Sequence, residues 1–584
     1  MAASGSANPR YEAHENPPFL VSLGFGLQFG LIASATLLIT PVVVAKAAGQ
    51  DEAYLLWMVF ASLLVVGIAT LIQVRRLGFV GAGAVLPMTT APFAIPFCIS
   101  ALVDGGPATL TTLILVTGVF QVAISKWLFL LRRIVTPVVG GTVLMILSIT
   151  LASVVFGLLN EASMEEPTAA PLTALATLVV VAALVLRGSP VLRLWAPVIG
   201  IAVGCVVAAL LGIYDASLVT RTGWVGLPSF WPGLGLDFSI DFWTLLPAFL
   251  FLGIIISIQV NGESITQQRA AWREQRAIDF REVQGSLSGA AAANLMAGAG
   301  GAVPIIVNSG GAPFIQATGM ASRRVGYCIA GVFIILAFVP KASGLLSTIP
   351  GPVMTGYLIL VTGTLFVEGA RTVIQSERDR QKLTVAGISY WIAAAFQFGL
   401  FALPNLGHVW GALLKSGVTT GGITVIVMIL FLEVTSPRRM RFQAPLHVDS
   451  LPDLNAFVAK FAARKGWGPQ MVSRLEAAAE ETLLTLAPLD LTADIVDDGE
   501  DEENQRRLVV LALVDGQAAE LEFIGGANEE NLEDRLRQMQ EHVEEDPMEH
   551  ATSLRLLRSF ASSVQHQQYQ DTEIITVRIE ADGK

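Results

Sequence analysis

A succession of apolar stretches, each close to the length of a membrane-spanning helix, dominates the first three quarters of this chain. A helix that crosses a bilayer needs about 20 consecutive apolar residues. Fourteen stretches between residues 19 and 434 approach or exceed that length. They are 19–44, 54–73, 79–102, 108–131, 134–158, 168–187, 192–213, 241–265, 281–299, 303–320, 324–340, 350–370, 384–403 and 417–434. The pattern predicts an all-α polytopic membrane protein.

The composition agrees with this fold class and limits the function. Only 15% of the 584 residues are charged, whereas soluble domains carry about 25%. The net charge of −11 arises mostly after position 450, and an acidic chain is a poor ligand for nucleic acid. The sequence shows no nucleophile–base arrangement, metal-ligand cluster or phosphate-binding loop. We therefore expect no enzyme activity, cofactor, metal or nucleic-acid partner.

Basic residues occur in every second loop between the apolar stretches. These loops, and the exit from the last stretch, contain Arg75, Arg76, Arg132, Arg133, Arg187, Arg193, Arg269, Arg273, Arg276, Arg281, Arg323, Arg324, Arg371, Arg378, Arg380, Lys382, Arg438, Arg439 and Arg441. Lysine and arginine accumulate in cytoplasmic loops. The alternation predicts an even number of spans, both termini in the cytoplasm and a multi-pass protein of the inner (cytoplasmic) membrane.

Two similar segments indicate an internal repeat. Residues 137–144 (PVVGGTVL) and 352–359 (PVMTGYLI) align without a gap, 215 residues apart, at the starts of the fifth and twelfth stretches. Seven spans separate them, and because seven is odd the two halves have opposite orientations. Inverted repeats of this kind are typical of secondary transporters. A chance match of two short proline–glycine patterns is the alternative.

The third and tenth stretches, also seven apart, are interrupted by glycine and proline. The interruptions are residues 81–87 (GAGAVLP) and 303–313 (VPIIVNSGGAP). In inverted-repeat transporters, paired broken helices meet near the membrane midplane and form the substrate site. The N-terminus of a half-helix presents free N–H groups that accept an anion or a carbonyl-rich ligand. Alternatively, these glycines only permit close helix packing.

Four short motifs resemble those of the nucleobase–ascorbate transporter family, which includes the uracil and xanthine permeases. They are Gly26-Leu27-Gln28, Thr136–Val143, Ile349–Gly356 and Thr318–Arg324. The resemblance covers about residues 17–436. It implies fourteen spans as a 7+7 inverted repeat, with spans one to four and eight to eleven as a core domain and the others as a gate domain. It also implies a homodimer, proton or sodium coupling and an elevator-like movement of the core.

The same resemblance supplies candidate binding residues. Glu263 matches a glutamate in span eight that binds the nucleobase, and Gln267 occupies a position that is often Asp or His. In span ten, Gly310 and Gly311 replace the polar pair of the signature motif, and Ala290 replaces a polar residue in span nine. The candidate substrate-binding set is Gln28, Ala84, Glu263, Gln267, Ser309, Gly310, Gly311 and Thr318.

Glu263 is the strongest candidate for ion coupling. A carboxylate within a span is costly and marks a functional site by default. Burial favours its neutral form, so it can exchange protons, and it can also accept hydrogen bonds from N–H groups of a ligand. The alternative is that Glu263 lies near the cytoplasmic end of its span and pairs with Arg269 or Arg273.

The composition changes after Arg441, where a soluble tail begins. We divide the chain into a cytoplasmic N-terminal tail (1–17), a transmembrane domain (18–436), a linker (437–446) and a small cytoplasmic α+β domain (447–584). Within the last domain we expect helices at 447–466, 475–486 and 551–565, a hairpin of strands 508–514 and 519–524, and a strand at 573–580.

The tail resembles the histidine-kinase-type ATPase domains of anti-sigma factor kinases. Residues 475–481 look like the helix that carries the N-box of those domains, with Glu481 at its glutamate position. Thr485 stands at the metal-binding asparagine position, and residues 523–527 lack the aspartate of the D-x-G-x-G loop. The resemblance therefore implies a degenerate, non-catalytic domain that regulates or dimerises the membrane part.

The sequence thus favours a secondary active transporter that carries a nucleobase-like or other small polar or anionic solute, coupled to protons or sodium. Its partners are the solute, the coupling cation, the lipid membrane and a second copy of the chain. The alternatives are an anion transporter or a membrane sensor that has lost transport and signals through the C-terminal domain.

Overall fold

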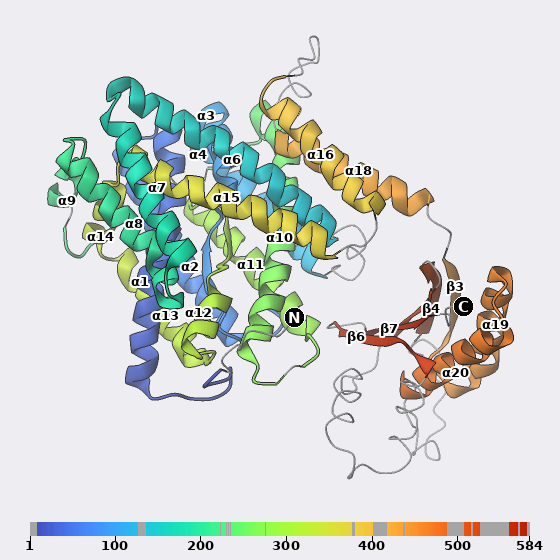
Figure 1. Ribbon diagram of the computed structural model, residues 1–584. Coiled ribbons are helices and arrows are strands. Elements are labelled where there is room, and N and C mark those ends of the chain that lie inside the picture. The colour runs from blue at the N-terminus through green and yellow to red at the C-terminus, as the bar shows by residue number, and fades with distance from the viewer. Residues whose placement is uncertain are drawn as a thin grey trace. The chain divides into compact units, whose positions relative to one another are not determined.

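The computed structural model describes most of the chain, in two units that we treat separately (Figure 1). The first comprises residues 1–273 and 282–432, and the second comprises 274–281 and 433–584. The described residues are 9–126, 136–221, 223–228, 230–231, 233, 235–274, 276–376, 380–400, 417–435, 439–486, 507–515, 518–525, 560–569 and 573–580.

The first unit is built of helices, and each of the fourteen predicted stretches contains one. They are α1 (Phe19–Ala47), α2 (Glu52–Arg75), α3 (Ile95–Asp104), α4 (Gly106–Lys126), α6 (Pro137–Glu165), α7 (Ala169–Arg187), α8 (Pro190–Leu210), α9 (Ser217–Arg221), α10 (Ile240–Ala271), α11 (Phe280–Gly300), α12 (Gly311–Thr318), α13 (Arg323–Ala337), α14 (Pro340–Ser347), α15 (Gly351–Ser376), α16 (Arg380–Gln397) and α18 (Gly417–Thr435). In the described part of the chain, eight helices are long and apolar enough to cross a membrane: α1, α2, α4, α6, α7, α8, α10 and α15. A helical membrane protein is therefore confirmed, and the count of fourteen spans stays a prediction.

Glycines from the internal repeat lie where helix backbones touch. A Cβ atom on Gly141 of α6 would stand 2.6 Å from the carbonyl oxygen of Gly369 in α15. A Cβ atom on Gly356 of α15, which aligns with Gly141, would stand 2.4 Å from the carbonyl oxygen of Ala174 in α7. Because only glycine permits such approach, the repeat motif places α15 directly against α6 (Figure 1).

The two interrupted stretches each form a short strand followed by a half-helix, as the glycines and prolines predict. Strand β1 (Met88–Thr90) precedes the 3₁₀ turn η1 (Pro92–Ala94) and then α3. Strand β2 (Ile305–Val307) precedes α12. The two strands pair antiparallel, with Thr89 opposite Ile306. Segments separated by more than 200 residues in sequence therefore meet and satisfy each other's backbone groups, which unwound chain inside a membrane requires.

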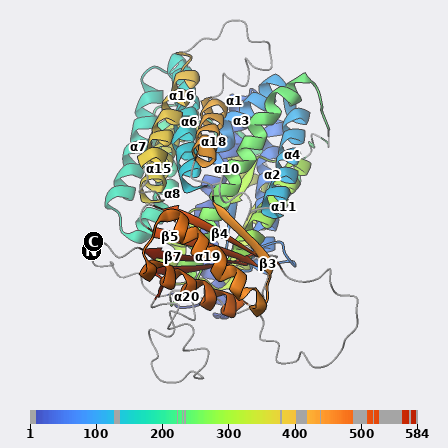
Figure 2. The same cartoon turned by 90° about the vertical axis from the view of Figure 1, so that its right-hand side faces the viewer.

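The second unit is a layer of helices on an antiparallel sheet (Figure 2). In its described residues the strands are β3 (Met440–Pro445), β4 (Arg507–Asp515), β5 (Ala518–Gly525), β6 (Ser563–Gln568) and β7 (Glu573–Glu580), in the order β3-β4-β5-β7-β6. Helices α19 (Leu451–Lys465) and α20 (Pro469–Leu486) pack on one face through a buried core that includes Leu454, Leu475 and Phe523. The predicted β4–β5 hairpin is present.

Two predictions for this unit are wrong. Residues 440–445 of the expected linker form strand β3, which pairs with β4. Its alternation of half-buried Met440 and Phe442 with exposed Arg441 and Gln443 has the period of a strand. The helix expected over 551–565 is wrong at its C-terminal end, where residues 563–565 belong to strand β6. Pairing with β7 overrides the local pattern there. Residues 551–559 lie outside the described residues.

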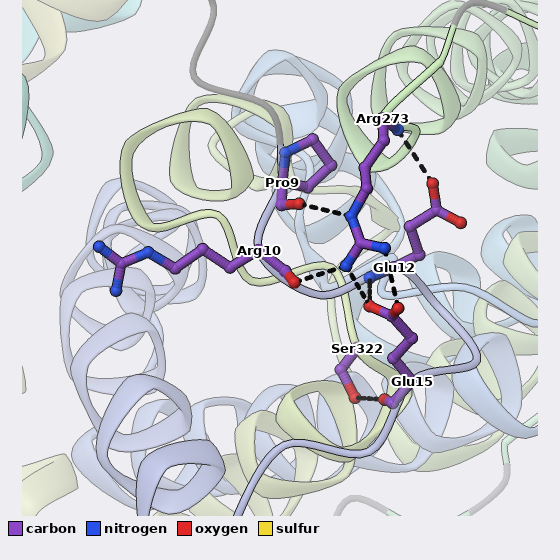
Figure 3. Close-up of polar contacts among 6 residues, drawn as sticks. All are labelled: Pro9, Arg10, Glu12, Glu15, Arg273 and Ser322. Carbon is purple, nitrogen blue, oxygen red and sulfur yellow. Dashed lines mark hydrogen bonds and ion pairs between the residues drawn. The ribbon is translucent and has the colours of Figure 1, made fainter.

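Residues 9–17, which we call the N-terminal clip, bind the turn that follows α12 (Figure 3). The amides of Arg10 and Tyr11 both donate to the carbonyl oxygen of Gly319, at 2.8 and 3.1 Å, and the amide of Ala321 donates to the carbonyl oxygen of Tyr11 at 3.0 Å. Gly319 ends α12 in the left-handed conformation, with φ +72°, which glycine adopts without strain. The segment ahead of α1 is thus fastened to the turn that follows α12.

Arg273, just after α10, joins the clip through its whole guanidinium group (Figure 3). Its Nε donates to the carbonyl oxygen of Pro9 at 3.0 Å, and Nη2 donates to that of Arg10 at 2.6 Å. Nη1 and Nη2 bind the two carboxylate oxygens of Glu15 at 2.9 and 2.5 Å. Paired parallel bonds of this kind are the strong form of the arginine–carboxylate contact.

Because of the clip, we expect the stability of the protein to decrease as the pH falls through the acid range. The hydrogen bonds from Arg273 and from the Glu12 amide hold the pKa of Glu15 below its ordinary value of 4.5. A lowered folded-state pKa contributes stability above the unfolded value that is lost as the pH falls through the folded value. Near neutral pH, we expect Glu15→Gln to lower the apparent unfolding temperature, and the difference from wild type to shrink below about pH 4.5. Glu165→Gln, at an exposed carboxylate of α6, is the control. A difference that is constant with pH would contradict the role of Glu15.

Candidate functional site

A cavity of about 1110 Å³ lies within the first unit, where the broken segments meet. Its walls come from α1, the β1–η1 segment, α8, α10, the β2–α12 segment and α15. Ligand cavities in proteins measure about 300–1,000 Å³, so this one is large enough for a small organic solute. Elements far apart in the sequence contribute, from α1 near the N-terminus to α15.

One face of α1 supplies a stripe of apolar and hydroxyl-bearing residues to the cavity. Phe29, Ala33, Thr36 and Thr40 line it at helical spacing. The hydroxyl of Thr36 donates to the carbonyl oxygen of Ala33 at 2.9 Å. The hydroxyl of Thr40 is buried, with 1% of the residue exposed, and has no hydrogen-bond partner among the described residues. An unpaired buried hydroxyl is unfavourable, so Thr40 would gain a hydrogen bond from a ligand that reaches it.

Aromatic rings form the apolar part of the walls. Phe29 of α1 and Phe314 of α12 meet edge to face, with 4.9 Å between ring centroids. Phe93 of η1 and Tyr357 of α15 line other parts of the same cavity. Flat aromatic surfaces beside scattered polar groups suit a planar heterocycle, because the rings stack while the polar groups fix its orientation.

The starts of both half-helices open on the cavity. Pro92 and Phe93 line it from η1, and Ser309 and Gly310 line it from the residues ahead of α12. The side chain of Asn308 accepts a hydrogen bond from the Gly310 amide at 2.8 Å and so shapes this start. The partial positive charge at a helix N-terminus favours electronegative ligand atoms.

Among the residues predicted from the sequence, Ser309 and Gly310 line the cavity, whereas Gly311 and Gln267 lie behind its wall. Gln267 is 2% exposed, and its Nε2 donates to the carbonyl oxygen of Asn308 at 3.0 Å. A Cβ atom on Gly311 would stand 2.6 Å from Oε1 of Gln267. Gln267 therefore supports the start of α12 from α10.

Glu263 does not line the cavity either, but it contacts a residue that does. It is partly buried on α10, and its Oε1 accepts a hydrogen bond of 3.4 Å from Nε2 of Gln259, which does line the cavity. Among the described residues no arginine pairs with Glu263, and Arg273 is engaged by the N-terminal clip. The arrangement links a carboxylate to the cavity through one amide.

The remaining predicted residues do not line the cavity. Gln28 is the neighbour of Phe29, and Ala84 precedes β1 by four residues. The hydroxyl of Thr318 donates to the carbonyl oxygen of Phe314 at 2.7 Å, which secures the end of α12. In the segment of Ala84, the lining residues are instead Thr89, Thr90, Pro92 and Phe93.

Sequence reasoning missed Asn294, the polar residue of α11 that fixes β2. Its Oδ1 accepts from the Ile305 amide at 2.7 Å, and its Nδ2 donates to the Ile305 carbonyl oxygen at 3.0 Å. Nδ2 also donates to Oε1 of Gln121 in α4 at 2.9 Å. Asn294 lies one helical turn beyond Ala290, where the resemblance had placed a polar residue. The available signal was an asparagine within the apolar second half of α11, in the run from Ala290 to Ala297.

Comparison with known proteins gives a consistent picture. A sequence model described as "Permease family" (Xan_ur_permease) matches residues 21–400. A putative purine permease of Clostridium perfringens is 28% identical over 436 residues, covering 72% of this chain and 92% of that protein. The xanthine permease XanP of Escherichia coli is 28% identical over 445 residues, covering 72% and 94%. The uric acid permease PucJ of Bacillus subtilis is 25% identical over 439 residues, covering 71% and 94%.

Proposed function

The chain belongs to the permease family of nucleobase–ascorbate transporters, and from that premise we propose that it carries a purine-type solute in the cavity between β1, β2, α1 and α15. One observation supports this most: the cavity joins aromatic rings, an unpaired threonine hydroxyl and two half-helix starts at the crossing of the broken segments. That combination suits a flat heterocycle with several hydrogen-bonding atoms.

In this proposal the solute is held by groups on three elements. Phe29 and Phe314 contact its ring, while the hydroxyls of Thr40, Thr89 and Ser309 bind its polar edge. The other residues that the family resemblance indicates have supporting roles, because they lie behind the wall. Gln267 and Gly311 keep the start of α12 in place, and Thr318 secures its end.

We propose that a proton is the coupling ion and that Glu263 carries it. The carboxylate contacts Gln259 at the cavity wall, so protonation of Glu263 changes what Gln259 presents to the solute. A titratable carboxylate inside a membrane span is a typical proton relay. Sodium is the other candidate, and the two are separated by comparing uptake driven by a pH gradient with uptake driven by a sodium gradient.

The cavity lies between elements of the two proposed domains. Its lining residues on α8 and α15 belong to the gate, and those on α1, η1, α10 and α12 belong to the core. We propose that the core moves against the gate in an elevator-like cycle, in a homodimer of the inner membrane with both termini in the cytoplasm. The N-terminal clip joins core elements only, so it moves with them.

Uptake into proteoliposomes tests the function. The purified protein should accumulate at least one of xanthine, urate, hypoxanthine and uracil, and unlabelled substrate should compete. Protein-free vesicles and a heat-denatured sample are the controls. If no solute is taken up and none binds, the transport proposal is wrong. Binding without uptake would favour the sensor alternative.

Thr40→Val should weaken solute binding about three- to tenfold, as expected for the loss of one hydrogen bond of about 0.5–1.5 kcal/mol. The substitution keeps the shape of the side chain and removes an unpaired hydroxyl, so the fold should tolerate it. Ser34→Ala is a matched control, because Ser34 lies on the same helix, is buried, donates to the carbonyl oxygen of Leu31 and does not line the cavity. Equal affinities for the two variants would remove Thr40 from the site.

A further inference from the structure

The described side chains that line the cavity carry positive charge and no negative charge. Among its lining residues in the described chain, Arg193 is the one charged side chain, and none is an aspartate or glutamate. Glu263 stands behind the wall and is bonded to Gln259. The surface that a solute meets is therefore neutral or positive, and it contains no carboxylate to accept the N–H groups of a neutral base.

The guanidinium of Arg193 is hydrogen-bonded to the backbone just ahead of α8, and its charge is not neutralised by an ion pair among the described residues. It is the fourth residue of α8, and its Nε donates to the carbonyl oxygen of Gly188 at 3.0 Å. The side chain is exposed and forms no ion pair in the part of the chain that the structure describes. A guanidinium remains protonated at any physiological pH, so the cavity carries a permanent positive charge at this edge.

The uncharged polar groups of the cavity favour the same kind of ligand. Thr40 presents a buried hydroxyl with no partner among the described residues, and Thr89 and Ser309 add hydroxyls nearby. The half-helix start at α12 adds partial positive charge. Hydroxyls and helix starts act as hydrogen-bond donors to an anion, and Arg193 supplies the full countercharge.

We propose that the cavity takes its solute as a small anion with several oxygen acceptors, and that Arg193 is the residue that selects for negative charge. The inference rests on the proposed function where the solute is a purine. In that case the chain prefers a purine monoanion, such as urate, over a purine of similar size that is neutral, such as hypoxanthine. Compact inorganic oxyanions also carry negative charge on several oxygen acceptors, so they are tested separately from the purines.

The experiment compares solutes and variants under one condition. Binding and uptake of urate, hypoxanthine, bicarbonate and sulfate are measured near neutral pH, where urate is an anion and hypoxanthine is neutral. The proteins are wild type, Arg193→Gln, Arg193→Lys and Arg187→Gln. Arg187 is an exposed arginine at the end of α7 that does not line the cavity, so Arg187→Gln is a matched removal of one charge.

We expect Arg193→Gln to weaken urate binding about fivefold, the scale of one partly exposed charge pair, while hypoxanthine binding changes less than about twofold. Arg193→Lys should retain most of the urate affinity, and Arg187→Gln all of it. The effect of Arg193→Gln should also diminish as salt concentration rises, because exposed charges are screened.

The outcomes separate this inference from the proposed function. Preference for urate over hypoxanthine, lost in Arg193→Gln, supports both. Preference for hypoxanthine, or an equal loss of both purines in Arg193→Gln, overturns the anion inference and leaves purine transport intact. Binding of bicarbonate or sulfate without any purine supports anion selection and contradicts the proposed function. If none of the four solutes binds, the anion inference is wrong, and uptake of xanthine and uracil then decides the proposed function.

Discussion

Replacing Glu263 by glutamine is expected to reduce uptake driven by a pH gradient by roughly a hundredfold, the lower end of what a positioned proton-transfer group contributes. Glutamine has nearly the same shape and can keep the contact with Gln259, but it cannot release a proton. The coupled step should therefore fail while the cavity stays intact. Exchange of labelled for unlabelled solute, which needs no net proton movement, should persist.

The measurement compares gradient-driven uptake, exchange and solute affinity for the variant and the wild type. Glu161→Gln, at an exposed carboxylate of α6, is the control for loss of a negative charge. Affinity in Glu263→Gln should stay within about threefold of wild type, since the side chain does not line the cavity. If gradient-driven uptake is unchanged, Glu263 is not the coupling group. If exchange and gradient-driven uptake are both lost, Glu263 acts in solute binding instead of coupling.

Asn294→Ala is expected to destabilise the protein by about 3 kcal/mol or more, because three buried polar groups would lose their partner at roughly 1–3 kcal/mol each. These are the N–H and C=O of Ile305 and the Oε1 of Gln121. Ile305 lies in β2, which pairs with β1 at the cavity. The variant should therefore also lose solute binding.

Asn261→Ala is the matched control. Asn261 lies on α10, and its buried Oδ1 has no hydrogen-bond partner among the described residues. The same substitution there removes no hydrogen bond and should leave the apparent unfolding temperature nearly unchanged. If Asn294→Ala and Asn261→Ala unfold at the same temperature in detergent, the network around Asn294 does not stabilise the strand pair.

The architecture of the membrane part follows closely from local chemistry. Glycine and proline in residues 81–87 and 303–313 interrupt a continuous helix, and the structure has a strand and a half-helix start just after the first segment and within the second. Gly141 and Gly356, which revealed the repeat, prove to be points where backbones touch. These features are predictable because the residue type itself fixes what the chain can do at that place.

The site was less predictable, because its geometry depends on partners distant in sequence. Local pattern does not show that β1 begins at Met88, so Ala84 was placed where Thr89 and Phe93 lie. Nor does it show that Gln267 turns toward Asn308 instead of the cavity. The α1 stripe, in contrast, is predictable from helical spacing alone, since Thr36 and Thr40 share a face with Phe29.

The same limit explains the errors in the soluble unit. Residues 440–445 are too short to identify as a strand without β4, and the polar residues 563–568 form a strand only through their pairing with β7. The β4–β5 hairpin, in contrast, joins neighbours in sequence. Two apolar runs on either side of Asp515-Gly516 were sufficient to predict it.

A structure determined by electron microscopy with urate or xanthine present tests the central claim most directly. We predict density for the solute in the cavity, contacting Phe29, Thr40 and Ser309, and absent from a sample prepared without solute. Solute bound outside the space enclosed by α1, β1, α12 and α15, or a cavity that stays empty at saturating concentration while the purified protein still transports, would contradict the account.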